Sequence, residues 1–563
     1  MSISDESEQA GIEHAREAWE AGRLKAELET RGEWKKEFQT HSGLPVKGPY
    51  TPLDLKEKGH TYLDNVGFPG LFPYTRGHSA TMYRGVPPRQ FVYSGFASAE
   101  ATNERYRYLL QQGAKEFIVA LDLPTQIGLD SDDPLGEGEV GKIGVPVDSL
   151  ADMETIFDGI RLDQVFAGCS ANAVGPIFLS LLLAVAKKQG LAPNQLHLLV
   201  QNDVLKEFIA RGAYIFPPKH AVKFSVDVVE YVARQGLSDL YAPIMYCGYH
   251  MREAGANVIQ EMAFTLADAV EYIEELLRRG ISINDLPAPR GLFVAGTDIF
   301  EEVCKHRAFR RMWARTMKER FGATNPRVMA LTYSVGSQAS QYTAQQPMNN
   351  VVRGTIQALV EVLSGIQAIN IAAYDEALSI PTEESATLAL RTLQIVSNET
   401  GVPNTVDPLA GSYYVEALTD ELEERATKLF QEVQSLGGAA KCIQSGYLDK
   451  QIAREAYEEY KRVKTGERVV IGVNQFQDNQ PVPVNLTKFD AKEEERQIEK
   501  VKRLRRERDN AAVEKTLKGV KEAALEGVNM VEPIMAAVEV YATVGEICGT
   551  LRTVYGEYVR PVY

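Results

Sequence analysis

The amino-acid sequence predicts an α/β protein built on a (β/α)8 barrel of the TIM type, with an N-terminal arm and a C-terminal, mostly helical extension. Eight short apolar runs lie at residues 90–95, 117–123, 165–170, 196–202, 244–249, 291–296, 328–334 and 368–373. Such runs are typical of parallel strands that are buried on both faces. Stretches with helical spacing separate them, for example residues 99–112, 177–189, 262–279, 309–321 and 350–364. Strands and helices that alternate eight times over ~310 residues indicate a (β/α)8 barrel.

The alternation by itself leaves one other architecture open, which is an open, doubly wound parallel sheet. Nucleotide-binding sheets of that class carry a glycine-rich phosphate loop after a strand. No such loop follows any of the eight apolar runs. The barrel is therefore the favoured fold.

The pattern divides the chain into three segments. Residues 1–85 combine a charged stretch with helical spacing and a region rich in glycine, proline and tyrosine, which predicts a helical arm followed by an ordered loop region. The barrel occupies residues 86–405, and the helical extension occupies residues 406–563. Residues 492–508 are densely charged, which predicts an exposed helix with a solvated face. A face that docks on a partner is the alternative.

Composition excludes several classes of function. The formal net charge of -15 argues against nonspecific binding to nucleic acid. The five cysteines are dispersed and show no metal-ligand spacing, so we expect reduced thiols in a cytoplasmic protein and no metal site of this chain's own. The N-terminus is acidic and unlike a signal peptide. The longest apolar run, residues 177–186, is too short to cross a membrane.

Barrel enzymes place their reactive side chains at the carboxyl ends of the strands. The polar residues at those predicted ends are Tyr93, Asp122, Ser170, Asn172, Gln201, Asn202, Asp203, Tyr249, His250, Thr297 and Ser334. His250 could donate a hydrogen bond to a carbonyl or act as a general acid, although a lone histidine is more often structural. The set contains no metal cluster and no nucleophile with an obvious base. Polar anchors without a reactive group indicate chemistry that is carried by a cofactor.

Motifs along the chain carry a resemblance to a known family. They are FPGLFPYTRGHSATMY (68–83), SGF (94–96), ALDLPTQIGLDSD (120–132), VQNDVLKEF (200–208), GYHMREAG (248–255), YDEALSIPTE (374–383), DPLAGSYYVE (407–416), IGVN (471–474) and ATVGEI (542–547). In this order they resemble the N-terminal part of methylmalonyl-CoA mutases. Matched motifs of this length, running from about residue 45 to the end, are far more specific than a lone glycine motif.

The resemblance implies a barrel that is split around the chain of an acyl-CoA substrate and a radical 1,2-rearrangement that uses adenosylcobalamin. The cobalamin-binding domain of the family carries the fingerprint D-x-H-x-x-G, which this sequence lacks. We therefore expect no cobalamin-binding domain here. Two-subunit members of the family carry that domain on a separate small subunit, which implies a small cobalamin-binding partner and a heterotetramer.

The resemblance implies active-site roles for four residues at the predicted strand ends. Tyr93 matches a tyrosine that lies against the substrate and helps to expel the adenosyl group. His250 matches a histidine that hydrogen-bonds the thioester carbonyl. Tyr249 lines the same pocket, and Gln201 matches an active-site glutamine.

Further residues match substrate and cofactor contacts. Arg211 matches an arginine that pairs with the free carboxylate of methylmalonyl-CoA, and Arg290 matches a contact to the CoA chain. Glu376 matches a glutamate near the adenosyl ribose. Ala120 keeps the wall of the acyl pocket small and uncharged, whereas hydroxyacyl mutases of the family have an aspartate there and an isoleucine at Tyr93. Without the resemblance, Arg211 reads as a surface helix end and Glu376 as an ordinary helix charge.

Some positions depart from the family pattern. Two expected arginines are replaced by Val86 and Phe91, and Arg89 could supply one charge from a shifted position. Small polar residues that line the CoA channel in the family are replaced by Ile118, Leu199, Ala242 and Leu292.

The sequence thus predicts the large subunit of an adenosylcobalamin-dependent acyl-CoA mutase that acts on a carboxylated acyl-CoA such as methylmalonyl-CoA. Two alternatives stay open. One is a mutase for a branched or hydroxylated acyl-CoA of the 2-hydroxyisobutyryl-CoA type. The other is a degenerate barrel that serves as a scaffold without turnover.

Overall fold

The computed structural model describes residues 6–111, 113–379, 381–478 and 491–560 of the 563-residue chain. Its strands form two five-stranded sheets, in the orders β1-β10-β9-β8-β7 and β2-β3-β4-β5-β6, and all of the strand pairs are parallel. The strands are β1 (Arg89–Gln90), β2 (Val92–Ser94), β3 (Glu116–Val119), β4 (Phe166–Ser170), β5 (His197–Gln201), β6 (Tyr241–Ala242), β7 (Tyr246–Cys247), β8 (Arg290–Ala295), β9 (Thr332–Ser337) and β10 (Ala368–Asn370). The predicted α/β class with parallel strands is therefore confirmed.

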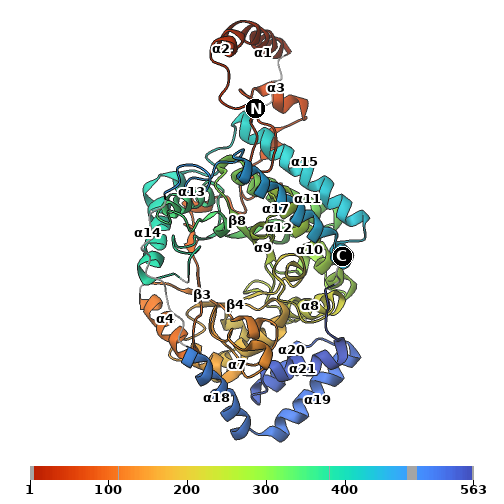
Figure 1. The fold of residues 1–563 in the computed structure, drawn as a ribbon. Helices are drawn as coiled ribbons and strands as arrows, with labels where there is room; N and C mark the ends of the chain where they lie inside the picture. The colour runs from red at the N-terminus through yellow and green to blue at the C-terminus, as the bar shows by residue number, and fades with distance from the viewer. Residues whose placement is uncertain (1–5, 112, 380, 479–490, 561–563) are drawn as a thin grey trace.

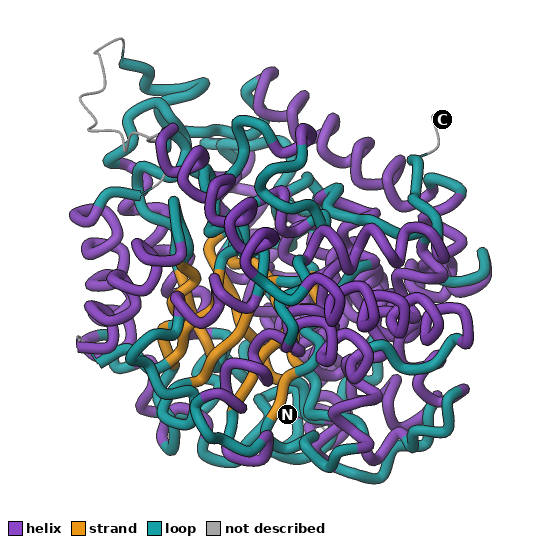
Figure 2. Tube along the Cα trace, turned by 90° about the horizontal axis from the view of Figure 1, so that it is seen from below, coloured by secondary structure: helices purple, strands orange, loops and turns teal. Residues whose placement is uncertain are grey.

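The strands lie inside a shell of helices (Figures 1 and 2). The helices between strands include α4 (Ala99–Gln111), α5 (Leu123–Gln126), α6 (Leu150–Ile156), α7 (Gly175–Lys188), α8 (Pro218–Arg234), α9 (Tyr249–Glu253), α10 (Val258–Arg278), α11 (Ile299–Arg315), α12 (Pro326–Met329) and α13 (Asn349–Leu363). After the last strand come α14 (Glu383–Glu399), α15 (Tyr413–Ser435), α16 (Ala439–Gln444), α17 (Tyr447–Thr465), α18 (Ala491–Glu507), α19 (Asn510–Glu526), α20 (Val531–Glu539) and α21 (Val544–Tyr555). Within the described residues, none of the helices is both long and apolar enough to cross a membrane.

The structure corrects one predicted strand. The apolar run at 328–334 is not a single strand, because its first two residues belong to α12 and β9 begins only at Thr332. Asn325 caps this short helix by accepting a hydrogen bond from the backbone N–H of Arg327. Pro326 occupies the first helical position, where its fixed φ favours a helix start. Local capping therefore overrides the apolar pattern.

The C-terminal helices pack onto the same body. Helix α7 is buried along nearly its whole length because α20 covers the side that faces away from the sheet. The charged helix α18 also has a docked face, on which Gln497 is buried and donates hydrogen bonds to Asp148 and Asp152. Arg505 of the same helix pairs with Asp130 at 2.6 Å. Some charged side chains of residues 492–508 thus face solvent, and others hold α18 against the rest of the chain.

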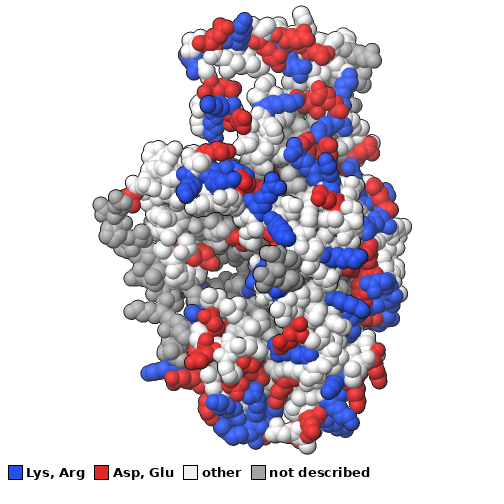
Figure 3. All heavy atoms as spheres, turned by 45° about the vertical axis from the view of Figure 1, so that its right-hand side comes forward, with Lys and Arg blue, Asp and Glu red and all other residues white. Residues whose placement is uncertain are grey.

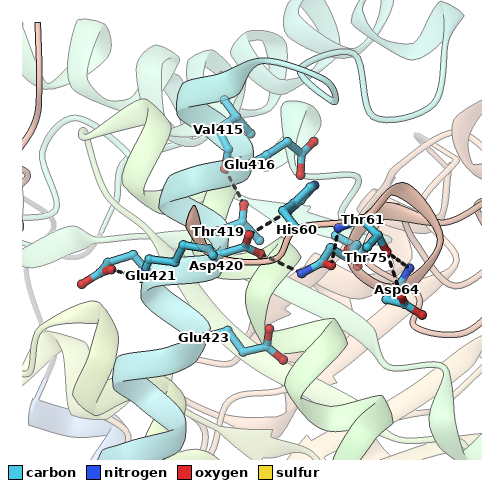
Figure 4. Close-up of polar contacts among 12 residues, drawn as sticks. His60, Thr61, Asp64, Thr75, Val415, Glu416, Thr419, Asp420, Glu421 and Glu423 are labelled. Atoms are coloured by element: carbon cyan, nitrogen blue, oxygen red, sulfur yellow. Dashed lines mark hydrogen bonds and ion pairs between the residues drawn. The ribbon is translucent and has the colours of Figure 1, made fainter. Parts of the chain in front are cut away.

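At the opposite end of the molecule, the N-terminal segment is held by polar contacts (Figures 1 and 4). Its helices are α1 (Glu6–Trp19), α2 (Lys25–Thr30) and α3 (Pro52–Glu57). Nδ1 of His60 lies 2.7 Å from Oδ2 of Asp420 on α15, and Asn65 donates to Oδ1 of the same carboxylate. Arg311 of α11 also contacts Asp420, at 2.6 Å. One buried carboxylate therefore joins the N-terminal loop region to two helices of the body.

All five cysteines are buried, and none of them is paired with another cysteine. Burial raises the pKa of Cys247 to about 12, so this thiol stays protonated at neutral pH.

Candidate functional site

Several of the predicted site residues lie together at the carboxyl ends of the strands. The sheet register aligns Ser170 at the end of β4 with Gln201 at the end of β5. Tyr93 of β2 hydrogen-bonds Ser170 and interacts electrostatically with Arg211. His250, in the first turn of α9, also interacts with Arg211. The site is thus built from the ends of β2, β4, β5 and β7, which belong to both sheets.

Tyr93 is accessible to solvent although protein atoms desolvate its hydroxyl. Its side chain is 48% exposed, yet its pKa is raised, chiefly by burial, while Arg211 and a hydrogen bond with Ser170 oppose the rise. Exposure and desolvation coexist when a side chain borders a hollow that protein atoms surround on most sides. The surface of the molecule is hollowed near the middle of the face in Figure 3.

His250 is surrounded by partners that fix its ring. Nδ1 lies 3.1 Å from Nζ of Lys206 and 3.2 Å from Sγ of Cys247. The pKa of His250 is held well below its usual value, first by burial and then by the charges of Lys206 and Arg211. Of the two roles that the sequence left open, this geometry favours a neutral hydrogen-bond donor over a general acid.

A π-helical turn, η7 (Glu207–Arg211), follows β5 and carries the charged part of the site. Such turns are frequent at functional sites because they re-aim side chains within a helix. Oε1 of Glu207 lies 2.6 Å from Nζ of Lys206 and 3.3 Å from Nη1 of Arg211, and both Lys206 and Glu207 are fully buried. Arg211 is therefore already paired within the chain.

Lys206 and Glu207 were not among the residues that the sequence singled out. The available signal was the charged pair in VQNDVLKEF, directly after an apolar strand, where two neighbouring charges are unusual so close to a core. Asp203, which was singled out, anchors the segment instead of facing the open space. It accepts hydrogen bonds from the Tyr272 hydroxyl at 2.9 Å and from the backbone N–H of Cys247 at 2.8 Å. Burial raises the pKa of Asp203 to about 6.

Tyr249 lies against strand β9. Its hydroxyl donates to the backbone oxygen of Ser337 at 3.3 Å, and its ring covers Gly336. A Cβ at Gly336 would lie 3.1 Å from the Tyr249 ring, so the close approach of ring and strand favours glycine there. Glu376, in the loop after β10, is an exposed residue that interacts with Tyr249. Protein atoms around its carboxyl group nevertheless desolvate it and, together with the charge of Asp375, raise its pKa.

Gln201 and its neighbour Asn172 present unused polar atoms. Both side chains are 3% exposed. Among the described residues, no partner satisfies Nε2 of Gln201 or either amide atom of Asn172. Because buried polar atoms are nearly always hydrogen-bonded, such atoms are typical of a site that is completed by a ligand or water.

The two remaining arginines of the predicted site lie at the other end of the sheets. Arg89 opens β1 and pairs with Glu116 at 3.3 Å, and Arg290 opens β8 with its guanidinium 5.2 Å from the centre of the Phe166 ring. The pKa of Arg290 is lowered by burial and by the nearby charge of Arg89. The structure does not bring this pair together with His250. Ala120 directly follows β3 and is 7% exposed.

Between the two ends lies a separate apolar cluster. It contains Ile118, Leu199, Ala242 and Met245, with Phe166 and Leu292 packed against it. Four of these positions are those at which the family is expected to carry small polar residues. Gly168 sits between Ile118 and Leu199, where an added Cβ would approach both side chains to 2.9 Å. The cluster is therefore tightly packed.

Comparisons with known proteins identify relatives of the whole chain. The family profile described as Methylmalonyl-CoA mutase matches residues 39–557. The chain is 40% identical over 551 residues to the 2-hydroxyisobutanoyl-CoA mutase large subunit of Aquincola tertiaricarbonis, with 97% of each chain covered. It is 38% identical to the methylmalonyl-CoA mutase of Escherichia coli, with 93% of this chain and 72% of that protein covered. The large subunit of methylmalonyl-CoA mutase from Streptomyces virginiae is also 38% identical, with 93% and 72% covered. The chain belongs to the methylmalonyl-CoA mutase family.

Proposed function

We propose that this chain is the large, substrate-binding subunit of an adenosylcobalamin-dependent acyl-CoA mutase. The observation that carries the proposal is the alignment over 97% of both chains with a protein named as a mutase large subunit. The grouping of Tyr93, His250 and Arg211 at one end of the sheets supports it.

We also propose that the two sheets are halves of one split (β/α)8 barrel. β1 and β2 are separated only by Phe91, yet β1 pairs with β10 and β2 pairs with β3. β6 and β7 are separated only by residues 243–245, yet β6 pairs with β5 and β7 pairs with β8. Each sheet thus continues into the other at both edges, which supports a barrel at residues 86–405 between an arm at 1–85 and an extension at 406–563.

In this proposal the chain's own residues bind and orient the acyl thioester. His250 donates a hydrogen bond from Nε2–H to the thioester carbonyl, and Gln201 supplies a further polar contact through its unused Nε2. Tyr93 fills the space beside the acyl group, and Tyr249 forms the wall against β9. Shielding from water keeps a reactive intermediate from side reactions.

The residues at the carboxyl ends fit an adenosyl group better than a metal. Glu376 is exposed beside Tyr249, and the unpartnered amide atoms of Gln201 and Asn172 could hydrogen-bond a polar organic ligand. Within the described residues, no group of three or more histidine, cysteine, aspartate or glutamate side chains is arranged to hold a metal ion. When bound, adenosylcobalamin supplies radical chemistry for the 1,2-rearrangement. Glu376 would hold the adenosyl ribose, and a small partner subunit would hold the corrin ring and its cobalt, in a heterotetramer.

For the acyl group, the first candidate is an uncharged branched chain, with or without a 2-hydroxyl. The pairing of Arg211 with Glu207 at 3.3 Å supports it, because Arg211 already has a carboxylate partner within the chain, which it shares with Lys206. The alignment with the 2-hydroxyisobutanoyl-CoA mutase large subunit points the same way. The second candidate is the carboxylated acyl-CoA that the sequence suggested, which is favoured by Tyr93 and Ala120 and by the partial exposure of Arg211.

The test combines the purified chain with its small subunit and adenosylcobalamin. We expect equilibrium dialysis to show tight cobalamin binding by the pair and weak binding by this chain alone. Mass spectrometry then follows isobutyryl-, 2-hydroxyisobutyryl-, methylmalonyl- and ethylmalonyl-CoA. Tight stoichiometric binding by this chain alone would contradict the two-subunit proposal. If binding is normal and none of the esters rearranges, the scaffold alternative is favoured.

A further inference from the structure

Lys206 is a fully buried lysine for which the proposed reaction gives no role. Its Nζ atom contacts Oε1 of Glu207 at 2.6 Å and Nδ1 of His250 at 3.1 Å. A buried ammonium is costly unless every contact is favourable, so its placement against a histidine nitrogen requires a reason.

The contact with His250 fixes where the imidazole carries its proton. An ammonium group has three N–H donors and no acceptor. The hydrogen bond can therefore form only if Nδ1 of His250 is unprotonated and accepts. A neutral imidazole with a bare Nδ1 carries its proton on Nε2. In the part of the chain that the structure describes, no protein partner hydrogen-bonds Nε2, which leaves this N–H available to a ligand.

The surrounding charges keep this state in place. The titratable groups near the imidazole are Lys206, Glu207 and Arg211 of the η7 region, Cys247 and Tyr249 beside it, and Asp203 through the backbone of Cys247. Protonation of His250 would set two cations about 3 Å apart, which is strongly unfavourable in a buried site. Glu207 contacts Lys206 without touching the histidine, so Nζ has a carboxylate partner of its own.

We propose that Lys206 is a positioning residue that locks His250 as a neutral imidazole with its proton on Nε2. The histidine is then a fixed hydrogen-bond donor toward the ligand and not a source of protons. This proposal rests on the proposed function in one respect only, which is that the thioester carbonyl accepts the hydrogen bond from Nε2–H of His250. The tautomer itself does not depend on which acyl group binds.

The wild-type chain provides the first test. Ring-¹⁵N-labelled histidine shows by NMR which nitrogen is protonated, and the His250→Gln variant identifies the signal. We expect the His250 signal to report a bare Nδ1 and a protonated Nε2 at every pH from 8 to 5. A proton on Nδ1, or titration near pH 6.5, overturns the proposal without any measurement of activity.

The second test removes the ammonium and leaves the local net charge unchanged. In the double variant Lys206→Met/Glu207→Gln, one positive and one negative charge leave together, so neither member of this buried pair is left alone. Arg211 loses its contact with Glu207, but its side chain is 24% exposed to solvent. We expect His250 to titrate at a higher pH than in the wild type, because one of the two charges that lower its pKa is gone, while burial keeps the midpoint below the usual 6.5. An unaltered signal overturns the proposal.

A matched control is Lys223→Met. Lys223 pairs with buried Asp227 at 2.8 Å, and Asp227 keeps a second partner in Arg279 at 2.7 Å. This variant should leave the His250 signal unchanged. If it shifts the signal as the double variant does, the effect is a general loosening of the fold, and the role of Lys206 is rejected.

The enzyme assembled with its small subunit and adenosylcobalamin gives an independent readout. We expect the double variant to gain an acid limb in the pH profile of kcat, with its midpoint at the pKa measured by NMR, and KM to change little. If the assembled wild type shows no turnover but the NMR result holds, the proposed function fails and the positioning role stands. A pH profile with the same shape in both enzymes overturns the positioning role.

Discussion

Nζ of Lys206 lies 3.1 Å from Nδ1 of His250, and this contact turns a histidine at a strand end into a neutral donor. The same lysine is held by Glu207, which also pairs with Arg211. Lys206 therefore determines the protonation of His250. Glu207 determines how much of the Arg211 charge the substrate meets.

Removal of the His250 side chain should lower turnover while the fold stays intact. A positioned hydrogen-bond donor contributes ~10²–10⁴-fold in rate, so His250→Ala should reduce kcat by that amount at an unchanged melting temperature. His197→Ala, at the exposed start of β5, serves as the control and should retain wild-type turnover. Near-wild-type turnover of His250→Ala would return this histidine to a structural role.

Arg211 should have little influence on the choice between esters. Because Glu207 already pairs with Arg211, we expect Arg211→Gln to change the ratio of kcat/KM for 2-hydroxyisobutyryl-CoA and methylmalonyl-CoA by less than ~10-fold, with the uncharged ester preferred in both enzymes. A carboxylate that depended on Arg211 would lose roughly 3–5 kcal/mol, or ~10²–10³-fold. A loss of that size for the carboxylated ester alone would establish the second candidate.

Acid should destabilise the chain through His41. Burial and the guanidinium of Arg468, 2.8 Å from Nδ1, lower the pKa of His41 to about 3. Between pH 6.5 and 3, His41 is therefore protonated in the unfolded chain but neutral in the folded chain. The free energy of unfolding should fall as the pH drops through this range, by about 1.4 kcal/mol per pH unit for this one proton.

The measurement compares urea unfolding of the wild type and His41→Gln from pH 6.5 to 4. The amide oxygen of glutamine can still accept from Arg468 but does not titrate, so the variant should lose stability less steeply, by about one proton. His197→Gln, at an exposed position, should keep the wild-type slope. Equal slopes for His41→Gln and the wild type would show that His41 is not held neutral.

The apolar cluster between the two ends of the sheets should contribute to stability as a packed core does. Leu199 is 2% exposed. Leu199→Ala should cost about 2–5 kcal/mol in the free energy of unfolding, because it leaves a cavity. Leu199→Met nearly conserves volume and should cost less than about 1.5 kcal/mol. If both variants are as stable as the wild type, the cluster is loosely packed and could open readily.

Buried parallel strands need continuous apolar runs, and each of the eight predicted runs overlaps an observed strand. The first run nevertheless contains parts of both β1 and β2, and none of the runs covers β6. The run at 328–334 was misjudged because the cap at Asn325 and the proline after it are local signals that apolar content conceals. The dense charge at 492–508 correctly indicated a helix, but its docked face depends on Asp148 and Asp130, more than 300 residues earlier in the chain.

The sequence by itself determined the family, the parallel α/β class and the strand ends at which Tyr93, Gln201, Tyr249 and His250 lie, because these follow from ordered motifs and local periodicity. Only the tertiary structure decided what surrounds those side chains. It placed Lys206 against His250 and brought Arg211 near both Tyr93 and His250. The physical reason is that protonation and pairing depend on distances of a few ångströms between residues far apart in sequence.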